Sequence, residues 1–132
     1  MDGKVLIITD DDDSMQQMAG EIAALVDGAG AYSVRTVQAE GFAGIDLLPC
    51  CAFFLGCSVA NPASFAYLAS MLAHINLAGR HCGLFSTNDN ALEYLGTMVH
   101  DSEAAVGEPL LVQEGFADRN FLQNWVKSIL ES

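Results

Sequence analysis

The chain has 132 residues, of which 52% are hydrophobic, and its 17 acidic and 5 basic side chains give a formal net charge of −12. This length suits one domain that buries roughly two thirds of the surface exposed by its unfolded form, so we expect a single domain over residues 1–132. The negative charge argues against nucleic acid and anionic membranes, which present phosphate, and favours a basic protein partner or a cation. Equally, the acidity serves solubility.

No apolar run approaches the roughly 20 residues that a membrane-spanning helix needs. The first four residues lack the basic region and cleavage pattern of a signal peptide, so we expect a cytoplasmic location. The cysteines form no CxxC pair and have no histidines at metal-ligand spacing. We therefore expect buried, reduced thiols and no metal site for the four of them, Cys50, Cys51, Cys57 and Cys82.

The amino-terminal half alternates apolar runs with one amphipathic segment. Residues 4–9 are an apolar run that predicts a first strand. Apolar side chains at helical spacing predict a helix over 15–27, with Ser14 as its N-cap and Gly28 as its stop. Alternation over 32–37 predicts a strand near the edge of a sheet, and the continuous apolar run 51–55 predicts a central parallel strand.

The second half repeats this alternation. Pro62 opens a predicted helix whose apolar stripe reaches Ile75 and which ends before Gly79. A strand over 81–85, a helix around 92–99, a short strand over 109–113 and a terminal helix over 122–130 follow. Five strands alternating with helices predict an α/β fold, a five-stranded parallel sheet with helices on both faces. Its ligand crevice lies at the carboxyl ends of the strands.

Several segments carry a family resemblance. Residues 54–58 read Phe-Leu-Gly-Cys-Ser, residues 77–80 read Leu-Ala-Gly-Arg before the strand that ends in Phe85, and residues 107–110 read Gly-Glu-Pro-Leu ahead of a helix that contains Trp125. In this order and spacing, together with Asp89 and the pair at 93–94, they resemble a short-chain flavodoxin over nearly the whole chain. The resemblance implies the flavodoxin-like three-layer fold and three loops that bind flavin mononucleotide (FMN).

The resemblance places these FMN loops at 10–15, 58–61 and 86–92. Each loop departs from the family pattern. The candidate cofactor-binding positions are Asp10, Asp11, Asp12, Asp13, Ser14 and Met15 in the first loop, Ser58, Val59, Ala60 and Asn61 in the second, and Ser86, Thr87, Asn88, Asp89 and Leu92 in the third.

The first loop departs most. Flavodoxins surround the FMN phosphate there with O–H and N–H donors at a helix amino terminus, whereas here only Ser14 remains a hydroxyl donor beside four aspartates. A phosphate with roughly two negative charges, about 6 Å from one ionised Asp, is repelled by roughly 3 kcal/mol at an effective dielectric near 40, before screening. Several such repulsions outweigh the helix-end attraction of about 1 kcal/mol. The aspartates also suit an ordinary role as solvated acids at a helix start.

The other two loops lack the rings that flavodoxins stack on the flavin. Ala60 stands where the family commonly has an aromatic side chain, and Leu92 stands where it often has an outer tyrosine. Tyr94 lies two residues further along. These two losses predict weaker binding rather than none.

We therefore expect a divergent flavodoxin-like protein that has lost ordinary FMN binding, carries no cofactor and acts as an acidic protein-interaction module. The alternative is an FMN-dependent electron carrier whose phosphate is held by backbone groups and by a cation that bridges to the aspartates. An enzyme of another type is not expected, because the sequence has no nucleophile elbow, no suitably spaced histidine and no dinucleotide fingerprint.

A cation site is a third possibility. Aspartates after a first strand also resemble the acidic pocket of response-regulator receiver domains, where carboxylates hold magnesium. That resemblance fails downstream, since Gly56 and Cys57 stand in place of a phosphate-accepting aspartate, and Gln113 and Glu114 in place of a lysine.

Overall fold

The computed structural model describes residues 3–41, 43–112 and 119–131. Four helices alternate with the strands: α1 (Asp13–Gly28), α2 (Ala66–Leu72), α3 (Asp89–His100) and α4 (Arg119–Leu130). The strands are β1 (Gly3–Thr9), β2 (Tyr32–Gln38), β3 (Cys50–Gly56), β4 (His81–Ser86), β5 (Ala105–Val106) and β6 (Leu110–Leu111). Three 3-10 turns lie between them: η1 (Ala39–Gly41), η2 (Gly44–Leu47) and η3 (Ala63–Phe65).

The strands form one parallel sheet in the order β2-β1-β3-β4-β5. The predicted parallel sheet is confirmed, with β2 at the edge and β3 inside. The strand predicted over 109–113 corresponds to the short strand β6, which pairs with the end of β4, whereas β5, which pairs with the start of β4, was not predicted. Pro109, which has no N–H for the ladder, lies in the break between them. Gln113 and Glu114 lie outside the described residues.

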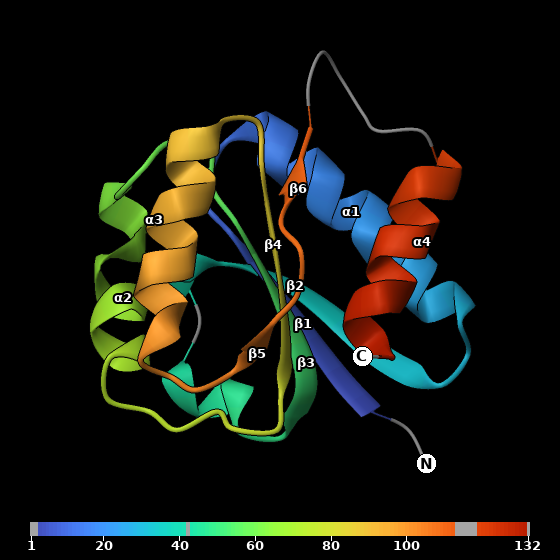
Figure 1. Cartoon of the computed structure of the whole chain (residues 1–132), viewed down its shortest axis with the longest axis horizontal. Helices are drawn as coiled ribbons and strands as arrows, with labels where there is room; N and C mark the ends of the chain where they lie inside the picture. The colour runs from blue at the N-terminus through green and yellow to red at the C-terminus, as the bar shows by residue number, and fades with distance from the viewer. Residues whose placement is uncertain (1–2, 42, 113–118, 132) are drawn as a thin grey trace.

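Helices cover both faces of the sheet, α1 and α4 on one side and α2 and α3 on the other (Figure 1). Successive side chains of a strand point to opposite faces, so each strand feeds two cores. Val5 and Ile7 pack with α1 and α4, while Leu6 and Ile8 pack with α2 and α3. Within the described ranges, no helix has both the length and the apolar character needed to cross a membrane.

Two helix ends differ from the sequence prediction. The N-cap of α1 is Asp12, whose carboxylate accepts the N–H of Met15 at 3.2 Å, so the prediction of Ser14 as the cap is wrong. The helix expected to run from Pro62 past Ile75 is also wrong, because Pro62 precedes the turn η3 and α2 ends at Leu72. Tertiary contacts override the helical pattern there, since the N–H of buried Leu77 donates to the carbonyl of Ser102 at 2.6 Å.

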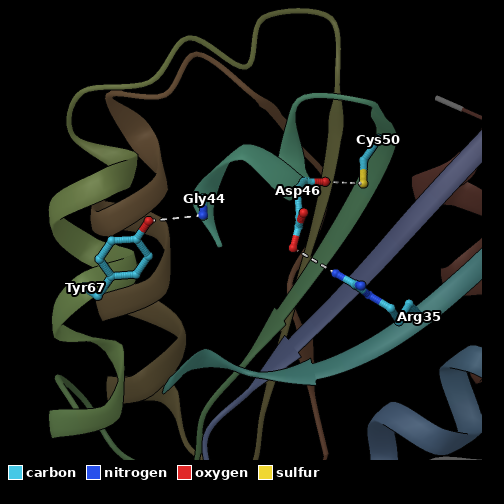
Figure 2. A network of polar contacts seen from close by, with 5 residues as sticks. All are labelled: Arg35, Gly44, Asp46, Cys50 and Tyr67. Carbon is cyan, nitrogen blue, oxygen red and sulfur yellow. Dashed lines mark hydrogen bonds and ion pairs between the residues drawn. The ribbon is translucent and has the colours of Figure 1, made fainter. Parts of the chain in front are cut away.

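The turn η2, between β2 and β3, is fixed by side chains from three neighbouring elements (Figure 2). Arg35 of β2 pairs with Asp46 at 2.9 Å, and the thiol of Cys50 donates to the Asp46 carbonyl at 3.3 Å. The hydroxyl of Tyr67 on α2 accepts the N–H of Gly44 at 3.1 Å. These contacts fix the start of β3, and the rigid strand in turn positions the loop that follows it.

Candidate functional site

Asp10 joins the first two loops at the carboxyl end of the sheet. It follows β1 directly and is 3% exposed. Its Oδ2 accepts both the N–H and the O–H of Ser58 at 2.9 Å, and its Oδ1 accepts the N–H of Asp12 at 3.3 Å. A buried carboxylate needs such partners to offset its lost hydration. Asp10 is therefore a structural link between loops 10–15 and 58–61.

The rest of the first loop divides into capping, exposed and buried positions. Asp12 caps α1 and so takes one of the first-turn N–H groups that could otherwise bind an anion. Asp11, Asp13 and Ser14 are exposed. Met15 is 1% exposed and belongs to the core beneath α1 and α4. The four aspartates are thus in three different environments.

Ser86 and Asn88 tie the third loop to the second. The buried hydroxyl of Ser86 donates to the carbonyl of Cys57 at 2.6 Å and accepts the N–H of Asn88 at 3.2 Å. The side chain of Asn88 caps α3 by accepting the N–H of Ala91 at 2.8 Å, and its amide nitrogen donates to the carbonyl of Ser58. Ser58 is consequently bonded to both neighbouring loops.

The remaining loop positions face outward. Thr87 and Asp89 are exposed beside the start of α3, and Val59, Ala60 and Asn61 are exposed in the loop after β3. Asn61 has a φ of 53°, the left-handed conformation that asparagine tolerates better than most residues. We call the surface formed by loops 10–15, 58–61 and 86–92 the carboxyl edge, and none of these loops contains an aromatic residue.

Leu92 and Tyr94 belong to the core rather than to the carboxyl edge. Leu92 is 9% exposed, and Tyr94 is half-buried against the same cluster under α2 and α3. The Tyr94 hydroxyl is buried and has no hydrogen-bond partner among the described residues. Burial, and secondarily the nearby Cys57, raise the pKa of Tyr94. Neither side chain is placed to stack on a ligand above the loops.

Cys57 is a buried thiol at the carboxyl end of β3. Burial first and the charge of Asp10 second raise the pKa of Cys57 to about 12, whereas the N–H of Val59 acts in the opposite direction. A thiol with this pKa is protonated at neutral pH, and the thiolate is the nucleophilic form. The arrangement around Cys57 therefore does not support covalent chemistry.

Metal-ligating side chains do not converge in the described part of the chain, where no group of three or more His, Cys, Asp or Glu residues could hold an ion. His100 lies 3.5 Å from its neighbour Asp101, and both side chains are largely exposed.

The sequence matches no protein-family model and no curated protein, but solved structures match it from end to end. A short-chain flavodoxin associated with a non-canonical PDU bacterial microcompartment superposes with a TM-score of 0.87 at 9% identity, covering 99% of this chain and 98% of that one. The chain has the flavodoxin fold. The sequence resemblance to short-chain flavodoxins is thereby confirmed as a similarity of fold.

Two further flavodoxin structures superpose on nearly the whole chain. Oxidised flavodoxin 2 from Bacillus cereus has a TM-score of 0.84 at 20% identity, covering 97% of this chain and 98% of that one. A variant of the Fusobacterium nucleatum flavodoxin bound to FMN has a TM-score of 0.68 at 12% identity, with 98% and 94% coverage. At such identities the likeness establishes the flavodoxin fold, and the chemistry has to be argued from the side chains.

Proposed function

We propose that this protein is an interaction module with the flavodoxin fold, that its carboxyl edge does not hold FMN in the usual way, and that it binds a basic protein surface instead. The observation that carries the proposal is the bond between Asp10 and Ser58. Both donors of Ser58 are given to an internal carboxylate at 2.9 Å. The protein thus already supplies an anion at the edge where a phosphate would need donors.

Electrostatics supports the same proposal. A phosphate at the start of α1 would meet Asp12, which already accepts a first-turn N–H, and the exposed carboxylates of Asp11 and Asp13. Each ionised Asp at about 6 Å repels a doubly charged phosphate by roughly 3 kcal/mol at an effective dielectric near 40. The site therefore needs a cation or a large rearrangement before it can accept phosphate.

The carboxyl edge suits a basic protein partner. Asp11, Asp13 and Asp89 are exposed there, and Val59 is an apolar side chain with 53% exposure between the loops. Apolar contact surrounded by polar groups is the usual anatomy of a protein interface. Exposed charges of one sign also speed the encounter with a partner of the opposite sign.

The first experiment is the visible spectrum of the purified protein, followed by titration of FMN with fluorescence quenching as the readout. We expect a colourless protein and no saturable quenching at high micromolar FMN. Asp10→Ser frees the Ser58 donors, whereas the double variant D11N/D13N removes two charges and leaves the hydrogen bonds intact. If Asp10→Ser binds FMN and D11N/D13N does not, the hydrogen-bonded carboxylate of Asp10 is what prevents FMN binding. A yellow wild-type protein or tight quenching overturns the proposal.

A hexalysine peptide tests the basic-partner half of the proposal by NMR titration. Asp13 and Asp89 lie in the first turns of α1 and α3, while Asp27 and Asp101 lie at the opposite ends of the same helices. We expect D13N/D89N to abolish salt-sensitive shifts and D27N/D101N, with the same change of charge, to retain them. Shifts spread evenly over the surface, or equal losses in the two variants, contradict a specific acidic edge.

The comparisons favour a second candidate, an FMN-dependent electron carrier. The similar structures are flavodoxins, and that of Fusobacterium nucleatum was determined with FMN bound. In this alternative, backbone N–H groups and a divalent cation bridging to the aspartates hold the phosphate. Repeating the FMN titration with and without magnesium separates the two candidates, because only the carrier predicts saturable, magnesium-dependent quenching and a flavin that is reversibly reduced.

A further inference from the structure

A groove runs between α1 and α4, which lie side by side on one face of the sheet (Figure 1). Its volume is about 530 Å³, within the range of roughly 300–1,000 Å³ that is typical of small-molecule sites. The residues that line the groove lie outside the three loops of the carboxyl edge. An inference about it is therefore independent of the proposed function.

The groove is open because α1 presents small side chains to it. Ala24 and Gly28 of α1 and its C-cap residue Ala29 line it, and a Cβ added at Gly28 would meet no atom within 4 Å. Leu25, Tyr32 and Leu130 contribute partly exposed apolar surface, and Gln123 adds a polar side chain. The helices therefore leave a hollow of mixed polarity that protein side chains do not fill.

Two cations and one carboxylate lie along one wall of the groove. Arg119 and Lys127, two of the five basic residues of a chain with net charge −12, line it from α4. They are eight residues apart, or about 12 Å along the helix. Arg119 pairs with Glu21 at 3.7 Å, whereas Lys127 has no ion pair among the described residues. Glu131, one turn beyond Lys127, also lines the groove, so an anion is best placed on the Arg119 side of Lys127.

We propose that this groove binds an amphipathic anion, a small molecule with an aliphatic or aromatic body and one carboxylate or sulfonate group. The body lies over the small side chains of α1, and the anionic group is near Lys127. The net charge of −12 repels anions from most of the surface. Binding of such an anion consequently requires the local cation and the apolar part of the groove together.

A matched pair of fluorescent probes tests this proposal on the whole chain. The first probe, 8-anilinonaphthalene-1-sulfonate, is an aromatic anion, and the second, N-phenyl-1-naphthylamine, has the same rings without the sulfonate. We expect saturable binding of the sulfonate at one site. Lys127→Gln should weaken sulfonate binding by about threefold, the effect of one exposed ion pair, and leave the neutral probe unchanged. Lys4→Gln, at the start of β1, is the control for charge.

Gly28→Leu tests the location, because the leucine side chain would occupy the hollow. Gly20→Leu is its matched control, since an added Cβ at this exposed position of α1 also meets no atom within 4 Å. We expect Gly28→Leu to weaken binding of both probes about tenfold or more by direct steric exclusion, and Gly20→Leu to leave it unchanged. Circular dichroism checks that both variants fold.

Three results would overturn the proposal. They are sulfonate binding that does not saturate, equal binding by the Gly28→Leu and Gly20→Leu variants, and a loss in Lys127→Gln that is the same for both probes. Amide chemical shifts supply a further check. Shifts centred on the three loops of the carboxyl edge, instead of on α1 and α4, would also contradict the assignment.

Discussion

Asp10 shows how one buried carboxylate can hold two loops together. Asp10→Ala would leave the N–H and O–H of Ser58 without their acceptor at the edge of the core. We expect a loss of about 2 kcal/mol in the free energy of unfolding, since unsatisfied buried donors cost about 1–3 kcal/mol. Urea unfolding measures this loss. Asp11→Ala, at the exposed neighbouring position, should change stability by less than about 0.5 kcal/mol. Equal effects would contradict the linking role of Asp10.

The raised pKa of Cys57 leads us to expect that the free energy of unfolding decreases at alkaline pH. Its pKa in the folded protein is raised to about 12 from an ordinary value near 9. Below pH 9 the thiol is protonated in both states, and between pH 9 and 12 only the unfolded chain ionises. The free energy of unfolding should therefore fall as pH rises through this window, by up to about 1.4 kcal/mol per pH unit from this group.

Urea unfolding at several pH values measures this dependence. Cys57→Ala removes the group and should make the decrease above pH 9 shallower. Burial also raises the pKa of Cys82 and Tyr94, so some dependence on pH will remain in the variant. An unchanged slope in Cys57→Ala would show that Cys57 ionises without unfolding.

At the scale of the element, two residues at the start of α1 could act as its N-cap, Asp12 and Ser14. Asp12 accepts the N–H of Met15, whereas Ser14 is an exposed residue of the first turn. We expect Asp12→Ala to destabilise the protein by about 1 kcal/mol, the usual cost of losing an N-cap, and Ser14→Ala to have almost no effect. Thermal unfolding of the two variants measures the difference. A larger loss of stability in Ser14→Ala than in Asp12→Ala would indicate that Ser14 is the cap after all.

The contact between β4 and its covering helix depends on a glycine. A Cβ at Gly83 would lie 2.6 Å from Cδ2 of Phe54 and 3.1 Å from Cη2 of Trp125, two rings whose centroids are 5.5 Å apart. Gly83→Ala should therefore cost about 1–3 kcal/mol through overpacking. Gly20→Ala, in open space on α1, should instead stabilise the helix by up to about 1 kcal/mol. Denaturant midpoints of both variants test the opposite signs.

The elements of this fold could be predicted from local patterns, but their ends and side-chain roles depended on distant contacts. Continuous apolar runs indicated the central strands, alternation indicated β2, and a period of 3.6 indicated α1, because burial on one or both faces imposes these patterns. The end of α2 was missed, and the chain that follows it is held by a bond between Leu77 and Ser102, 25 positions apart. The side of the sheet on which Asp10 lies could be predicted from the sequence. Alternation from Leu6 and Ile8 places it on the side of α2 and α3.

The place of the three loops in the fold could be predicted but not the bonds between them, and ligand binding by these loops stays a prediction. The resemblance placed the three loops at the carboxyl ends of the strands, where Asp10, Ser58 and Asn88 do meet. Asn88 directly precedes a helix, and its residue type favours capping, so this role carried a local signal. Its bond to Ser58 carried none, because it joins residues 30 positions apart.

At the scale of the whole molecule, a net charge of −12 makes stability depend on ionic strength. Exposed carboxylates repel one another in the compact state, and salt shortens the range of that repulsion from about 30 Å at 0.01 M to about 3 Å at 1 M. We expect added NaCl to raise the temperature of unfolding. The variant D11N/D13N should show a smaller increase, because it lacks two of the exposed charges at the start of α1.

MgCl2 at the same ionic strength separates screening from a specific cation site. If the aspartates only repel one another, the two salts should raise the unfolding temperature equally once ionic strength is matched. A divalent ion held by the aspartates would add stability that saturates with magnesium concentration, because it binds only the folded state. We expect equal effects, since Asp10 and Asp12 already accept protein donors. A saturating excess with MgCl2 that disappears in D11N/D13N would favour the cation-assisted FMN carrier.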